Sequence, residues 1–371
     1  MNPTENKVAG DVLRVKNHYV PEMYLKNWAQ RGQVATYALL VPNTSVPHWK
    51  KRSLRGIGYH RHLYTYLGRD GESDLFECWL GEKFESPAVI PIQKMLDDQR
   101  LSREDWYHLT RFLAAQDVRT PARLHEFIQR NEQTLQQELD KTVQASIAKL
   151  ERLARSNRPF PKVEVRQSVT ESPFKVSIQR NPAGDGYCKA EAVSGRKLWV
   201  HMSEHMLTDT LQHLHKHRWT IFEAPAGIPW LTSDKPVVRL NYYEPGNYDF
   251  KGGWGNQGSE ILFPLSPRHL MYTRIGHPLA KRKELVSEEL AVLINRFIAE
   301  HAHSYIFASA PSDIEGIRPR HVSLEAFLNE KHAWEAWHQQ QSQAEAELIA
   351  PSDYVAKAAS TNCTIFPTVA P

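Results

Sequence analysis

The stretch from Pro229 to Leu240, PWLTSDKPVVRL, places the strongest constraint on how this chain can fold. Two apolar runs that read as strands flank the polar segment Thr232 to Lys235, and Pro236 follows it. Short oxygen-bearing side chains bond their own backbone and proline fixes φ, so this composition is typical of a turn. The sequence therefore predicts a turn between two strands, here called the elbow (residues 232–236), with the Asp234 carboxylate at the edge of a sheet.

Apolar patterning along the rest of the chain predicts a mixed α+β fold. Strands are expected at 34–41, 57–67, 219–224, 260–264, 270–274 and 304–308, and helices at 74–99, 106–118, 121–154, 202–215, 284–303 and 324–349. Strands that cluster apart from a helical block favour α+β over regular βαβ alternation. We expect a central, mostly antiparallel sheet drawn from residues 34–67 and 217–308, flanked by long helices.

Composition also suggests four parts in the chain. We expect a flexible arm at 1–16, an N-terminal part of strands and then helices at 17–158, a sheet-rich C-terminal part packed on it at 159–322, and a helix with a frayed tail at 323–371. The boundary at Pro159 rests on proline, valine and short polar clusters through Gly186, which indicate a linker or an irregular region.

Composition limits the classes of protein to which this chain can belong. A chain of 371 residues with 41% hydrophobic residues can bury a large core, and no apolar stretch approaches the roughly 18 to 20 residues of a membrane span. Three widely separated cysteines form no metal spacing or disulfide framework, so we expect a cytoplasmic protein with no membrane partner. The formal charge of +4 permits an anionic partner such as nucleic acid without requiring one.

The elbow carries the first candidate chemistry. Asp234 can act as a general base or as a ligand of a hard metal, because a carboxylate on a turn at a sheet end suits either role. Ser233 beside it is a candidate substrate contact. The alternative is that Asp234 only caps the turn. The cofactor stays unassigned, with a divalent metal such as magnesium as one option.

Two further motifs carry polar residues at expected element ends. His18 and Tyr19 precede a short helix that begins near Pro21, where free backbone amides favour anions, and a histidine there can serve as acid or base. Gln116 and Arg119 share one face near a helix C-terminus, where arginine can hold a phosphate or carboxylate. The structural alternatives are an imidazole bonded to a backbone carbonyl, and an arginine paired with Glu85 or Asp117.

Other patterns in the sequence are weaker indications of a functional site. The pairs His60 and His62, and His213 and His217, each place two rings on one face of their element, but a metal site needs a third ligand. The basic run Lys50 to Arg52 can hold a nucleic-acid backbone, although a solvated loop explains it as well. The chain contains no G-x-G-x-x-G, P-loop or G-x-S-x-G motif.

Five ordered motifs then resemble a known family. The sequence NHYVPEMYLKNW, followed by FLAAQDVRTPAR, PWLTSDKPVV, ILFPLSPRHLMY and NRFIAEHAHSYIFAS, is similar to the domain-of-unknown-function family 4238 over about residues 16 to 310. The resemblance implies that twelve residues fall on the family's pattern: His18, Tyr19, Pro21, Gln116, Arg119, Pro121, Ser233, Asp234, Pro236, Pro264, Ser266 and Asn295. Lys235 departs from that pattern, and the resemblance implies no reaction.

Two functional hypotheses follow. The first is a hydrolase acting on a phosphate-containing substrate, similar to a nuclease or phosphodiesterase, in which Asp234 and His18 are catalytic. In it Tyr19, Gln116, Arg119 and Ser233 bind the substrate. The second is a non-catalytic module that binds or senses an anionic ligand, or a protein partner through the long helices.

Overall fold

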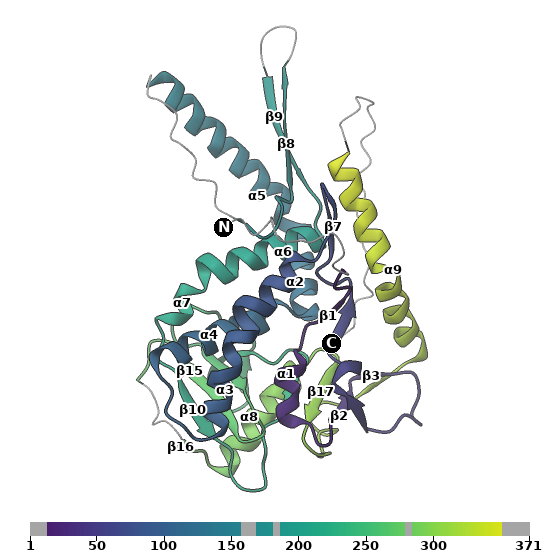
Figure 1. Cartoon of the computed structure of the whole chain (residues 1–371), viewed down its shortest axis with the longest axis vertical. Helices are drawn as coiled ribbons and strands as arrows, with labels where there is room; N and C mark the ends of the chain where they lie inside the picture. The colour runs from purple at the N-terminus through teal and green to yellow at the C-terminus, as the bar shows by residue number, and fades with distance from the viewer. Residues whose placement is uncertain (1–12, 157–167, 181–185, 279–283, 351–371) are drawn as a thin grey trace.

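The computed structural model describes residues 13–156, 168–180, 186–278 and 284–350. A compact body holds the sheets, and three elements project from the same side of it: helix α5, the β8–β9 hairpin and helix α9 (Figure 1). None of the described helices is both long and apolar enough to cross a membrane.

Two mostly antiparallel sheets form the centre of the body, which confirms the α+β class but divides the single expected sheet. The larger has six strands in the order β13-β12-β14-β15-β10-β16, and the smaller has four in the order β11-β17-β2-β4. Their bounds are β2 Gln33–Ala38, β4 Trp49–Ser53, β10 Thr220–Glu223, β11 Thr232–Ser233, β12 Val238–Glu244, β13 Asn247–Asp249, β14 Glu260–Pro264, β15 His269–Arg274, β16 Glu284–Leu285 and β17 Tyr305–Ala308.

Four smaller strand pairs lie outside these sheets. They are β1 Lys16–His18 with β5 Tyr59–Arg61, β3 Leu40–Val41 with β18 His321–Val322, β6 Tyr66–Gly68 with β7 Gly71–Ser73, and β8 Phe174–Arg180 with β9 Gly186–Ala192. The smaller main sheet pairs β17 with both β2 and β11, so strands from both halves of the chain share one sheet.

Nine helices are found among the described residues. They are α1 Glu22–Leu25, α2 Leu75–Leu80, α3 Val89–Leu96, α4 Arg103–Val118, α5 Pro121–Arg155, α6 Arg196–His205, α7 Gln212–His215, α8 Glu288–His301 and α9 Leu324–Ile349. Local chemistry explains the sharp ends: Ser102 and Asp105 form a capping box at α4, and Pro121 occupies the first turn of α5. The single helix expected at 74–99 is divided into α2 and α3 by short π- and 3₁₀-helical turns at residues 81–88, and Pro91 lies inside α3.

Three expectations about strands and loops were wrong. The single strand expected at 57–67 is two short strands, because His62 has a φ of 53° and ends the first. The basic run at Lys50 is not a loop, since it lies within β4 and pairs with β2. The irregular region expected after Pro159 contains the β8–β9 hairpin, while residues 157–167 and 181–185 lie outside the described part of the chain.

Aromatic residues of the first motif hold the elbow in place. The Tyr24 hydroxyl lies 2.6 Å from Thr232 Oγ1 and donates to the carbonyl of Pro264 at 2.7 Å. The Trp28 indole donates to the carbonyl of Trp230 at 2.8 Å. Because the side chains of Tyr24, Trp28 and Thr232 are buried, these hydrogen bonds join the N-terminal segment through the core to the elbow, to the residue Trp230 before it and to the end of β14.

Helix α9 docks on the body through a buried ion pair. Arg196 at the start of α6 contacts Glu345 with two nitrogens, at 2.5 and 3.1 Å, and both side chains are buried. Gln341 Oε1 accepts from the backbone N–H of Arg196 at 2.7 Å, an approach that a side chain at Gly195 would block.

We expect Glu345→Ala to destabilise the protein by about 3 to 5 kcal/mol, because it leaves the Arg196 guanidinium buried without its carboxylate. Urea unfolding monitored by tryptophan fluorescence measures this. The matched control is Glu347→Ala on the exposed face of the same helix, for which we expect a change below about 0.5 kcal/mol. An equal effect of the two variants would show that the ion pair does not hold α9.

Candidate functional site

The Asp234 carboxylate lies at the inner end of the elbow and ties it to β17. One oxygen accepts from the backbone N–H of His303 at 2.9 Å and the other from that of Ser304 at 2.7 Å. The backbone N–H of Asp234 donates to the carbonyl of Tyr305 at 3.0 Å. Burial raises the pKa of Asp234 to about 6, although these amide donors act in the opposite direction. The carboxyl group therefore changes its charge close to neutral pH.

Polar side chains from five other parts of the chain lie near this carboxylate or next to the residues that contact it. We call the group the polar corner, and its members are Tyr19, His60, His125, Asp234, His303, Tyr305 and Glu330. Tyr19 and Asp234 are buried, whereas the other five are half-buried and form the rim. Groups of acid–base type with shifted pKa values in one place are typical of a functional site.

Three imidazoles line the corner in a continuous set of ring contacts. The Tyr19 and His60 rings stack with centroids 5.3 Å apart, and the His60 ring stacks on Trp334 of α9 at 3.7 Å. The His125 and His303 rings meet edge to face at 5.2 Å. Burial lowers the pKa of His60 to about 3, and those of His125 and His303 to about 4. All three rings are therefore neutral at physiological pH, when each can donate one proton and accept another.

A second carboxylate comes from α9. Burial raises the pKa of Glu330, and the like charge of Asp234 raises it further. Tyr305 lies within the field of both carboxylates, and its phenol pKa is raised by burial first and then by Glu330 and Asp234. Among the described residues Glu330 has no cationic partner, so this carboxylate is available to a ligand.

Two arginines beside the corner are also unpaired within the described part of the chain. The positive charge of Arg52 on β4 acts to lower the pKa of Tyr305, and that of Arg318 acts to lower the pKa of His303. The Nε atom of each is buried without a hydrogen-bond partner. Lys235 differs because it pairs with Glu126 at 2.6 Å. Two guanidinium groups without a carboxylate partner therefore lie near two residues of the rim, Tyr305 and His303. A guanidinium group of this kind can bind an anion.

His18 and Arg119 form a separate cluster. A nitrogen of the fully buried Arg119 donates to the backbone carbonyl of His18, and another pairs with Glu85. The His18 ring lies 3.5 Å from Glu22, and its pKa is lowered mainly by burial. The pairing of Arg119 with Glu85 is the structural alternative that the sequence analysis left open for this arginine. His18 is not a member of the polar corner.

The remaining site residues predicted from the sequence differ in their surroundings and hydrogen bonds. Tyr19 is part of the corner, and its pKa is raised by burial and by Asp234. Ser233 is fully buried, where its hydroxyl oxygen accepts from the backbone N–H of Lys235 at 3.2 Å. Gln116 is also fully buried, and neither of its amide atoms has a hydrogen-bond partner. Of the six sequence candidates, the structure thus brings Tyr19 and Asp234 together in the corner.

Sequence reasoning did not single out most of the corner. His60 was considered only with His62, and the structure sends the two rings of this pair to Trp334 and His338 on α9. His125 and His303 had no local signal of a site. His303 does belong to the motif NRFIAEHAHSYIFAS, and its place directly before β17 is the signal that points to the elbow.

Two other groups in the described residues place three ligand-type atoms within 4.8 Å of one another: His62, Glu72 and His338, and Asp98, Glu223 and His269. In the first, Arg196 Nη1 lies 3.0 Å from the Nδ1 atom of His338. In the second, Arg268 pairs with both carboxylates, at 3.2 and 2.9 Å. A guanidinium group already contacts a member of each group, so we assign no metal to either; magnesium at Asp234 stays a prediction.

Comparison with known proteins gives one match. A family model described as a protein of unknown function (DUF4238) matches residues 16–312. No curated protein and no solved structure matches the chain. The family match ends before α9 begins, so Glu330 and Trp334 come from an element beyond it.

The raised pKa of Asp234 predicts a pH-dependent stability. The folded pKa of about 6 exceeds the ordinary value of 3.8, so the folded state holds this proton more tightly than the unfolded state does. Its contribution is complete below pH 4 and is lost as the pH rises through 6, by about 3 kcal/mol for a shift of about 2 units. Unfolding free energies of wild type and Asp234→Asn measured between pH 4 and pH 7 test this. We expect the difference between the two proteins to change across that window, and a constant difference would contradict the shift.

Proposed function

The chain belongs to the DUF4238 family, and on that premise we propose that it is a hydrolase acting on a phosphate-containing substrate, with the polar corner as its active site. The observation that carries the proposal is the pair of interacting carboxylates with raised pKa values, Asp234 and Glu330. Two unpaired arginines flank the same corner, Arg52 near Tyr305 and Arg318 near His303. We also expect it to act in the cytoplasm.

In this proposal each group has a distinct role. Arg52 and Arg318 bind the phosphate and balance the negative charge that builds up on its oxygens. Glu330 or Asp234 accepts the proton of a water molecule whose oxygen bonds to phosphorus. As the bond from phosphorus to the leaving oxygen breaks, a neutral imidazole or the Tyr305 phenol donates a proton to that oxygen. A divalent ion such as magnesium, held by the carboxylates, would supply further charge neutralisation.

One observation favours the alternative of a non-catalytic anion-binding module. Both oxygens of Asp234 already accept backbone amides, which is how a purely structural carboxylate is held. In that case the arginines and imidazoles would bind an anion without turnover.

The test is hydrolysis of bis(p-nitrophenyl) phosphate and of single-stranded DNA and RNA, with and without magnesium or manganese. We expect Glu330→Gln to lower kcat by about 10²-fold to 10⁴-fold, because it removes a proton acceptor without removing a protein hydrogen bond. We expect Arg52→Gln to raise KM. The matched controls are Glu335→Gln on α9 and Lys51→Gln on β4, both exposed, and we expect them to retain wild-type rates.

Wild-type rates in Glu330→Gln, or equal losses in a variant and its control, would contradict the proposal. Binding of a fluorescent phosphate ester that Arg52→Gln abolishes, without turnover in wild type, would establish the binding alternative instead.

A further inference from the structure

A large cavity lies outside the polar corner, between α5 and the β8–β9 hairpin. Its volume is about 1230 Å³, and its walls come from α5, β8, β9 and α6. Helix α5 and the hairpin project from the same side of the body (Figure 1), and residues of both elements line this cavity, which we call the groove.

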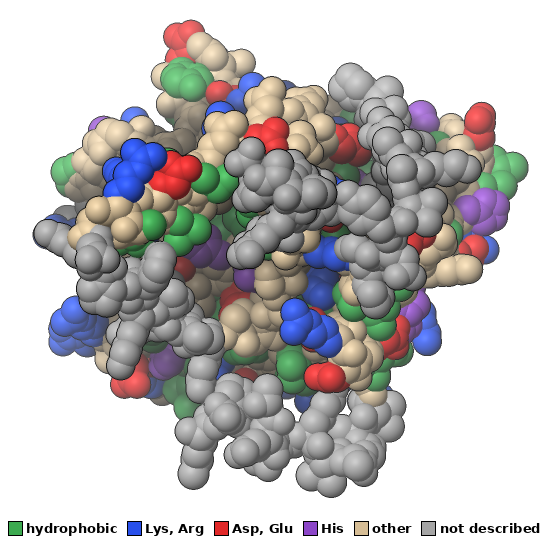
Figure 2. Space-filling view, turned by 90° about the horizontal axis from the view of Figure 1, so that it is seen from above, with side chains coloured by type: hydrophobic (Ala, Val, Ile, Leu, Met, Phe, Trp, Pro, Cys, Tyr) green, Lys and Arg blue, Asp and Glu red, His purple; other side chains and the backbone are tan. Residues whose placement is uncertain are grey.

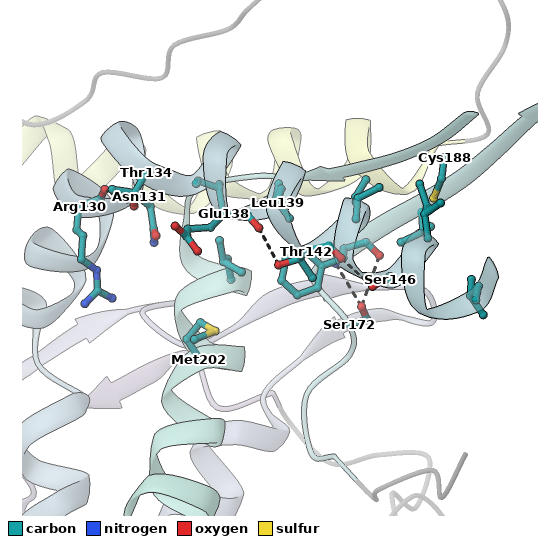
Figure 3. A pocket seen from close by; sticks show the side chains of 18 of the residues that line it. Arg130, Asn131, Thr134, Glu138, Leu139, Thr142, Ser146, Ser172, Cys188 and Met202 are labelled. Atoms are coloured by element: carbon teal, nitrogen blue, oxygen red, sulfur yellow. Dashed lines mark hydrogen bonds between the residues drawn. The ribbon is translucent and has the colours of Figure 1, made fainter. Parts of the chain in front are cut away.

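The groove is apolar along its length. Leu135, Leu139, Val143, Ile147 and Leu150 form one stripe of α5, because they recur every three or four residues. The hydroxyls of Thr142 and Ser146 beside this stripe donate to carbonyls one turn back in their own helix, each at 2.7 Å (Figure 3). They therefore require no partner across the groove.

This apolar surface is exposed in a single copy of the chain. The exposed fraction is 53% for Leu150 on α5 and 63% for Val176 on β8. A small ligand is usually 70 to 90% buried by its pocket, which a groove open between two projecting elements does not achieve. A long amphipathic helix that contacts its body only at one end also gains little stability by itself. The surface therefore fits a macromolecular partner.

The charges of α5 indicate which partner. Arg123 lies in the first turn of α5, and Glu126 pairs with it and with Lys235. Beyond Arg123, the segment from 126 to 140 carries four acidic residues and one basic residue, and the segment from 141 to 155 carries four basic residues and one acidic residue. These are Glu126, Arg130, Glu132, Glu138 and Asp140, and then Lys141, Lys149, Glu151, Arg152 and Arg155. Two such helices side by side in antiparallel orientation place each acidic half against a basic half. In parallel orientation, like charges would meet.

We propose that the groove is the interface of a homodimer, in which α5 of a second copy packs antiparallel against the apolar stripe. A two-fold axis near Asp140 and Lys141 makes this contact self-complementary, as closed dimers require. In Figure 2, which looks onto the projecting elements, positive and negative side chains are interspersed rather than gathered into a patch of one sign. That distribution suits a like molecule better than a uniformly charged partner.

The first test is the mass of the full chain in solution by light scattering and sedimentation equilibrium. We expect about 85 kDa, twice the 42.7 kDa of the chain. We expect Leu139→Glu to raise the dimer dissociation constant by at least about a hundredfold, because the substitution acts once in each copy. The matched control is Gln144→Glu, an exposed change on the opposite face of α5, which leaves the dimer intact. Circular dichroism confirms that both variants fold.

The second test examines orientation through charge. Glu132→Lys with Glu138→Lys should weaken the dimer by about tenfold or more, and adding Lys149→Glu with Arg152→Glu should restore it. A monomeric wild type at tens of micromolar would overturn the proposal, as would a dimer unaffected by Leu139→Glu. Failure of the fourfold variant to recover the dimer would overturn the antiparallel arrangement.

Discussion

The contact between Asp234 and the backbone of residues 303 and 304 is the interaction on which the candidate site depends. It joins the elbow to β17, the strand that pairs on one side with β11 and on the other with β2. Because β4 is the next strand of this sheet, the same contact sets the position of Arg52 relative to the carboxylate. A single buried acid therefore orders groups that are nearly two hundred residues apart in sequence.

The polar corner combines residues of two origins. Tyr19, Asp234 and His303 lie within the region that the family shares, whereas Glu330 and Trp334 come from α9, which follows that region. Family members that end without such a helix would have one carboxylate fewer and an uncovered His60. The polar corner thus draws part of its chemistry from an element outside the region that the family model matches.

Local chemistry allowed much of the fold to be predicted, and long-range contacts account for the rest. The bounds of α9 followed from periodicity, and the turn at Asp234 followed from its oxygen-bearing residues and proline. The strand at Lys50 was missed because β4, with the sequence WKKRS, lacks the alternating apolar residues that indicate a strand. Only its pairing with β2 reveals it. The meeting of His60, His125 and His303 was equally invisible, since these residues belong to three elements with no common sequence pattern.

The docking of α9 also pairs two histidines of the body with two ring-bearing side chains of the helix. His60 and His62 stack on Trp334 and His338, two residues apart on one chain segment and four apart on the helix. His62 has a positive φ and follows the end of β5, so the chain turns between the two histidines, whereas four helical residues advance about 6 Å along the axis of α9. Gln341 and Glu345 continue the same helical face toward Arg196. The register of α9 on the body is therefore fixed by these contacts. A shift of the helix by one residue would rotate each of these side chains away from its partner by about 100°. The connection before α9 can therefore change in length over evolution without altering which residue faces His60.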